Sequence, residues 1–79
     1  MIQTVSIPSE WLDYLAQESE TGMGYQVVEV KLKDGRFFPQ VVAGGGRFTQ
    51  VRGFRDIPFV EGDVASVKVN HRRWNFREE

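Results

Sequence analysis

The chain has 79 residues, no cysteine, one histidine and a net charge of −1 at neutral pH. Disulfide bonds are therefore excluded, and one histidine without any thiolate cannot complete a structural zinc site of the usual kind. A chain of this length forms a single domain, residues 1–79, whose core supplies about 3–5 kcal/mol of net stability without further help. Six Phe, two Trp and two Tyr make dense aromatic packing available as that help, and self-association is the alternative.

No apolar run approaches the roughly 20 residues that span a bilayer, and residues 1–6 lack the basic start and apolar stretch of a secretory signal. We therefore expect a soluble cytoplasmic protein without a membrane partner. The charge is uneven, since residues 1–24 sum to −4 with no Lys or Arg, whereas residues 25–77 sum to +5. This distribution indicates either a basic binding face or an acidic helix that covers a basic sheet edge, and the second interpretation is favoured.

The N-terminal quarter predicts a short strand within residues 1–7 and a helix over about residues 8–19. Pro8 suits a first helical turn, where its missing N–H costs nothing. The glycines of residues 21–24 are typical of a helix C-terminus. One helical face is apolar and contains Trp11, Leu12, Leu15 and Ala16.

The rest of the chain predicts strands over about residues 25–33, 36–43, 47–52 and 63–70. The first strand shows the alternation of apolar and charged residues that a half-buried strand requires. Asp34-Gly35 then predicts a hairpin turn, and Gly44-Gly45-Gly46 a second turn. Pro39 cannot donate to a ladder and predicts an edge or a bulge.

Two further predictions concern side chains in the C-terminal half. Ile57 and Phe59 are expected to point inward from an irregular segment. In the last strand, Ala65, Val67 and Val69 are expected on one face, opposite Ser66, Lys68 and Asn70.

These elements predict an α+β fold, mainly β, with an N-terminal helix followed by four or five antiparallel strands curled into a small, partly open barrel. Residues 28–37 and the apolar-Arg-Gly sequence at residues 51–53 resemble signatures of the small SH3-like barrels, and among them of the Sm-like proteins. The resemblance implies a bent sheet behind an N-terminal helix, and it implies RNA binding. The Sm-like RNA loop carries Asp and Asn where this chain has Gly44-Gly45-Gly46, so the resemblance supports the barrel more than RNA binding.

A basic and aromatic stretch forms the first candidate site. Arginines next to phenylalanines offer phosphate contacts beside stacking surfaces, which favours a single-stranded nucleic-acid binder. The ordinary alternative is that the phenylalanines are core and the arginines are solvated, and the isoelectric point near 5.8 favours it. The residues of this patch are Arg47, Arg52, Phe54, Arg55, Arg72 and Arg73.

Exposed aromatic side chains form the second candidate site, because such residues dominate protein interfaces. Trp11 and Tyr14 on the helix and Trp74 in the C-terminal tail are the candidate anchors, and for Trp11 the alternative is a contact between the helix and the sheet. Our first functional hypothesis is accordingly a non-catalytic module that binds another protein or a copy of itself.

Residues capable of catalysis are sparse. His71 is the one side chain suited to acid–base chemistry near neutral pH, but no nucleophile stands beside it in the sequence. Asp56, Glu61 and Asp63 are more typical of turns than of a cation site, and the triple glycine lacks the Lys-Ser/Thr of a nucleotide-binding loop. We therefore expect no enzyme, no bound metal and no cofactor.

Overall fold

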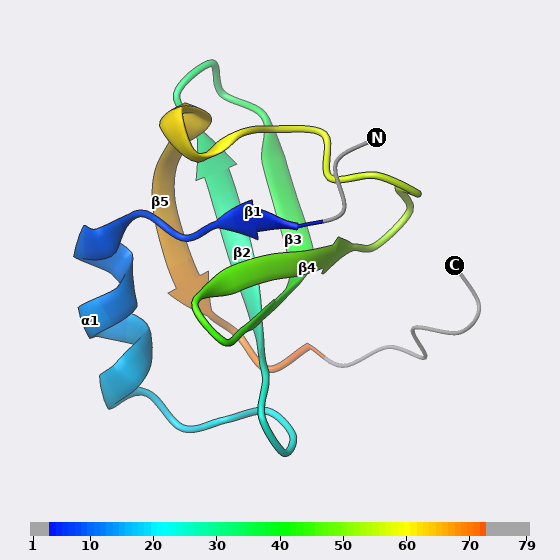
Figure 1. Cartoon of the computed structure of the whole chain (residues 1–79). Helices are drawn as coiled ribbons and strands as arrows, with labels where there is room; N and C mark the ends of the chain where they lie inside the picture. Colours follow the sequence, from blue (N-terminus) through cyan, green and yellow to red (C-terminus); the bar gives the residue numbers. More distant parts are fainter. Residues whose placement is uncertain (1–3, 73–79) are drawn as a thin grey trace.

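In residues 4–72, the part of the chain that this computed structural model describes, five strands form one antiparallel sheet. The strand order is β1-β4-β3-β2-β5, and the sheet curls into a half-barrel (Figure 1). The predicted fold class, α+β and mainly β with a partly open barrel, is confirmed. The elements are β1 (Val5–Ser6), α1 (Ser9–Gln17), β2 (Gln26–Leu32), β3 (Phe37–Gly44), β4 (Arg47–Val51), the 3-10 turn η1 (Glu61–Asp63) and β5 (Val64–Val69).

The helix α1 is shorter than predicted at both ends. Pro8 has an extended ψ of 139° and occupies the N-cap, so the helix begins one residue later. At the other end Glu18 is already extended, with ψ of 152°. The last turn contains no basic side chain that would favour the helix C-terminus. None of the helices in residues 4–72 has the length and hydrophobicity that crossing a bilayer requires.

The position of α1 follows from its two neighbours. It begins three residues after β1, one edge of the sheet, and it lies beside β5, the other edge (Figure 1). The hydroxyl oxygen of Tyr14 accepts a hydrogen bond of 3.0 Å from the backbone N–H of Val69. The helix therefore stands where the barrel is open and satisfies one backbone donor of the edge strand.

The core lies on the concave side of the sheet. The alternation predicted for β2 is present, with Val28, Val30 and Leu32 at most 1% exposed. Ile57 and Phe59 also point inward as predicted. The expected aromatic packing occurs around Phe59, because its ring lies 5.5 Å from that of Phe38 and 5.6 Å from that of Phe48.

The prediction for the faces of β5 is wrong at Ala65, which is exposed, while Val64 is 4% exposed and Val67 is 2% exposed. Lys31 pairs with Ser66 and Leu32 pairs with Val64, so Ala65 is an extra residue in the ladder. This bulge interrupts the alternation on which the prediction depended.

The bulge predicted at Pro39 is present. Val28 pairs with Val41 and Val30 pairs with Phe38, which leaves two β3 residues opposite one β2 residue. One of those two is Pro39, which has no N–H to offer to the ladder.

Candidate functional site

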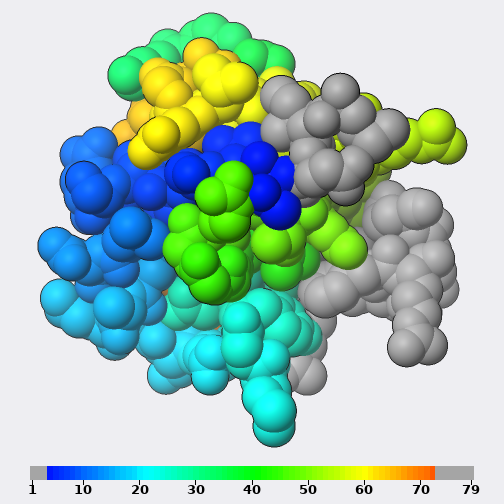
Figure 2. Space-filling view, in the orientation of Figure 1, coloured from blue at the N-terminus to red at the C-terminus, as the bar shows by residue number. Residues whose placement is uncertain are grey.

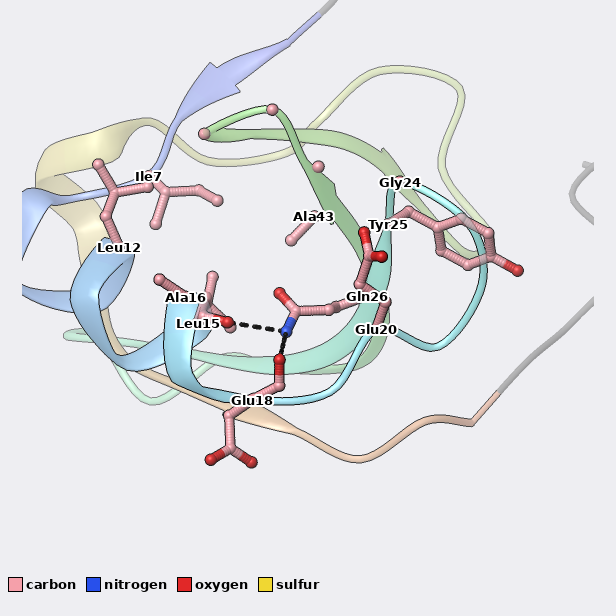
Figure 3. Close-up of a pocket in the computed structure, with 13 residues that line it drawn as sticks. Ile7, Leu12, Leu15, Ala16, Glu18, Glu20, Gly24, Tyr25, Gln26 and Ala43 are labelled. Atoms are coloured by element: carbon pink, nitrogen blue, oxygen red, sulfur yellow. Dashed lines mark hydrogen bonds between the residues drawn. The ribbon is translucent and has the colours of Figure 1, made fainter.

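An open cleft of about 390 Å³ lies between α1, the start of β2 and the β3–β4 hairpin (Figure 3). Its volume falls within the roughly 300–1,000 Å³ of small-ligand sites. Figure 2 shows this region of the surface, between the blue helix, the green hairpin and the cyan segment that precedes β2. The cleft exists because the sheet is a half-barrel, so the helix does not pack tightly against the hairpin on this side. Its apolar lining consists of Ile7, Leu12, Leu15, Ala16 and Ala43.

Gln26, the first residue of β2, places the amide of its side chain in this cleft. Its Nε2 donates toward three backbone carbonyl oxygens, those of Leu15 at 2.9 Å, Glu18 at 3.1 Å and Ser19 at 3.3 Å. Because carbonyl oxygens only accept hydrogen bonds, these contacts determine which end of the amide is nitrogen.

The other end of the same amide has no protein partner. Gln26 is 7% exposed, yet its Oε1 receives no hydrogen bond from any described residue. Figure 3 shows this oxygen directed into the cleft, toward the space between Leu15 and Ala43. Within residues 4–72, Trp11 Nε1 is the one fully buried side-chain polar atom without a partner, so solvent reaches Gln26 Oε1, and a donor that enters the cleft takes the place of water there.

The electrostatic character of the cleft is acidic. Glu18 and Glu20 line it, and among the described lining residues there is no Lys, Arg or His. The Glu20 carboxylate lies on the same side of the cleft as Gln26, whereas the Glu18 carboxylate is directed away from it (Figure 3). Glu20 is exposed and forms no ion pair within residues 4–72. These charges favour a cationic group in the cleft and oppose an anionic one.

The triple glycine forms an ordered wall of the cleft. Gly45 and Gly46 have φ of +61° and +80°, as a two-residue hairpin turn with both central residues left-handed requires. The carbonyl oxygen of Gly46 accepts the backbone N–H of Ile7 at 3.1 Å. A Cβ on Gly44 would lie 2.7 Å from the carbonyl oxygen of Gly24, so two backbone segments meet at this point.

Part of the predicted basic patch lies around Gln40 on β3, outside the lining of the cleft. The Arg52 Nη1 donates to Gln40 Oε1 at 2.7 Å, and Gln40 Nε2 donates to the carbonyl oxygen of Arg72 at 2.6 Å. Phe54, which is 46% exposed, and Arg55 follow Arg52 in the same turn. Gln40 therefore joins the side chain of Arg52 to the backbone of Arg72.

Arg47 does not join this group. Its Nε donates to Thr4 Oγ1 at 2.6 Å and its Nη1 to Ser6 Oγ at 3.3 Å, which holds it against β1 at the opposite end of β4. Arg73 lies outside the described residues.

The predicted anchors on the helix are engaged within the chain. Trp11 and Tyr14 are half-buried against the core, with ring centroids 5.9 Å apart in an edge-to-face arrangement. The Trp11 indole N–H is buried and has no acceptor among the described residues. These contacts make both side chains part of the packing between the helix and the sheet. Trp74 lies outside the described residues.

His71 and Asp63 lie outside the lining of the cleft. His71 Nδ1 lies 2.6 Å from Thr21 Oγ1, and its backbone φ is +55°. The Asp63 carboxylate accepts the backbone N–H of Val60 at 3.2 Å, which is the contact of a turn residue. Within residues 4–72, no cluster of three His, Cys, Asp or Glu is arranged to hold a metal ion.

Neither Gln26 nor Glu20 is among the residues that the sequence pattern predicts to be functional. The one local signal is a neutral polar residue directly before the valines that begin the first long strand. That signal is common in strands, so it does not distinguish a site residue from a solvated one.

Comparisons of this chain with models of protein families, with curated proteins and with solved structures give no match. The function proposed below therefore rests on the chemistry of the cleft.

Proposed function

We propose that this chain is a non-catalytic module that binds a segment of a partner protein in the cleft between α1 and the β3–β4 hairpin. The observation that carries the proposal is the fixed Oε1 of Gln26, which receives no donor from the described residues and opens into an apolar cleft. Binding sites commonly combine apolar walls with a few polar groups of defined orientation. Three carbonyl contacts hold the Gln26 amide in place, so a ligand gains this acceptor without ordering a side chain.

Exposed apolar side chains near the cleft favour a polypeptide as the ligand. Leu12 lines the cleft and is 37% exposed, and Met23 is 98% exposed in the turn that supplies Gly24 and Tyr25 to the lining. Methionine adapts its shape to different partners. A segment seated in the cleft is therefore able to bury further apolar surface on either side of it.

The test is selection of peptides from a displayed random library on the full chain. Ala16 is exposed and lines the cleft, whereas Gln17 is exposed and does not line it. Ala16→Phe fills the cleft, and Gln17→Phe puts the same side chain on the adjacent position of the helix. We expect the selected peptides to bind the wild type and Gln17→Phe alike, and Ala16→Phe at least tenfold more weakly. The proposal is wrong if no peptide is enriched, or if both variants bind equally well.

Nucleic-acid binding is the second candidate function, and the half-exposed ring of Phe54 between Arg52 and Arg55 favours it. The expected result is retention on a single-stranded oligonucleotide at about 50 mM salt, weakening steeply as the salt concentration rises. Arg55→Glu should reduce the salt dependence more than Lys68→Glu, which makes the same change of charge on β5. Absence of retention at low salt would remove this candidate.

A further inference from the structure

The cleft contains a side-chain amide oxygen of fixed orientation that receives no donor from the described residues. The described residues leave Gln26 Oε1 without a hydrogen bond, and although the residue is only 7% exposed, this oxygen is open to the solvent of the cleft. The Nε2 contacts prevent the amide from turning round, because turning it would set Oε1 against three carbonyl oxygens. The ligand group that meets Oε1 must therefore be an N–H or O–H donor.

The charge around this acceptor selects a cation among the possible donors. Glu20 contributes an unpaired carboxylate on the Gln26 side of the cleft (Figure 3). Residues 1–24 contain four carboxylates and no Lys or Arg, so α1 and the segment after it add to the negative potential. A charged donor forms a stronger hydrogen bond than a neutral one, and a nearby carboxylate strengthens it further.

The walls of the cleft select the shape of that cation. Leu12 and Ala16 on the helix face Ala43 and the glycine turn across the cleft (Figure 3). An alkyl chain is the group that fits such walls while its charged end reaches a polar atom at the base. The three tetrahedral N–H bonds of an ammonium group can donate to Oε1 and to the Glu20 carboxylate together. A planar guanidinium instead matches the two oxygens of a single carboxylate.

We propose that the cleft recognises the side chain of an unmodified lysine in the partner protein, an inference that rests on the proposed function. The lysine ammonium donates to Gln26 Oε1 and lies beside the carboxylate of Glu20. Its alkyl chain packs between Leu12 and Ala43. The flanking residues of the partner contact the exposed apolar side chains outside the cleft, so a polypeptide binds more tightly than a free amine.

The experiment is an NMR titration of the ¹⁵N-labelled full chain with the blocked tripeptide acetyl-Leu-Lys-Leu-amide, in which lysine supplies the only amine and the leucines supply the flanking apolar groups. The Gln26 side-chain amide and the backbone amides of Gly44, Gly45 and Gly46 report on the cleft. Matched peptides carry norleucine, Nε-acetyl-lysine or arginine in place of lysine, and n-butylamine represents the free amine. We expect saturable shifts with the lysine peptide, and binding at least tenfold weaker for the norleucine and acetyl-lysine peptides.

Two isosteric variants separate the charge in the cleft from the charge on the helix. Glu20→Gln should weaken binding of the lysine peptide by roughly two- to fivefold, the range of exposed ion pairs. Glu10→Gln removes the same charge from the first turn of α1, at a residue that does not line the cleft, and it should change the affinity less than Glu20→Gln does. Equal effects of the two variants would overturn the assignment of Glu20.

The outcomes distinguish this inference from the proposed function. If the norleucine, acetyl-lysine or arginine peptide binds as well as the lysine peptide, lysine recognition is overturned and the binding module stands. If n-butylamine binds as tightly as the lysine peptide, the ligand is a small amine, and both proposals are overturned. If library peptides bind in the cleft but none of them depends on a lysine, lysine recognition alone is overturned.

Discussion

Replacing Gln26 with methionine tests whether the side-chain amide holds the end of α1. Methionine has nearly the same length but no N–H donor, so the contacts with the carbonyl oxygens of Leu15, Glu18 and Ser19 are lost. An amide nitrogen has two hydrogens, and at most two of the three contacts are full hydrogen bonds. Each such bond contributes about 0.5–1.5 kcal/mol net.

One of the three carbonyls retains a partner, because the backbone N–H of Glu18 also donates to the Leu15 oxygen at 3.2 Å. We therefore expect Gln26→Met to lower the free energy of unfolding by about 1–2 kcal/mol. The melting temperature of a domain of this size should fall by about 5–15 °C.

Urea denaturation followed by far-UV circular dichroism measures this change, and an unchanged m-value confirms that the unfolding transition is comparable. Gln17→Met makes the same chemical change at an exposed position of α1, where we expect an effect within about 0.5 kcal/mol. If the two variants are equally stable, the hydrogen bonds of Gln26 do not support the helix end, and the fixed orientation of its Oε1 loses its basis.

Three further predictions concern the packing and the turns. Tyr14→Phe removes the acceptor of the Val69 N–H and should lower the free energy of unfolding by about 0.5–1.5 kcal/mol. Hydrogen exchange at the Val69 amide should become faster, and an unchanged exchange rate would contradict the contact. Phe48→Ala removes the ring of a residue that is 0% exposed and should lower the free energy of unfolding by about 3–5 kcal/mol. Circular dichroism should then show a largely unfolded chain. A native spectrum with an unchanged unfolding midpoint would place Phe48 outside the core. The backbone N–H of Arg36, followed by its guanidinium, holds the pKa of Asp34 below its ordinary value. The resulting stabilisation is therefore present at neutral pH and is lost as the pH falls through the lowered pKa. Asp34→Asn should remove this part of the acid dependence, and a carboxyl titration at the ordinary Asp value would refute the effect.

Local patterns predicted most of the sheet correctly. The alternation in β2 and the turn residues Asp34-Gly35 and Gly45-Gly46 act within a few residues, so they are present before any tertiary contact forms. The failure at Ala65 has the opposite origin. A bulge depends on how β5 pairs with β2, and nothing in the sequence of β5 by itself specifies that register.

The basic patch illustrates why residues close in sequence need not form one site. Arg47 and Arg52 are five positions apart, which in an extended strand of about 3.3 Å per residue separates them by roughly 16 Å. Arg72 is twenty positions from Arg52, yet Gln40 joins the backbone carbonyl of Arg72 to the side chain of Arg52 through hydrogen bonds. The path of the chain after β5 therefore brings the backbone at Arg72 beside Arg52, which the spacing in the sequence does not indicate.

The amino-acid sequence by itself determined the class of fold, the turns and the apolar face of β2, because periodicity and turn chemistry are properties of short segments. Only the tertiary structure decided the candidate site. In the sequence, Gln26 is only a polar residue at the start of a strand. In the fold, its Nε2 meets carbonyl oxygens at the end of α1, from residues eight and eleven positions earlier. That contact turns Oε1 toward the cleft, and it depends on the helix standing at the open side of the half-barrel, an arrangement that no local pattern encodes.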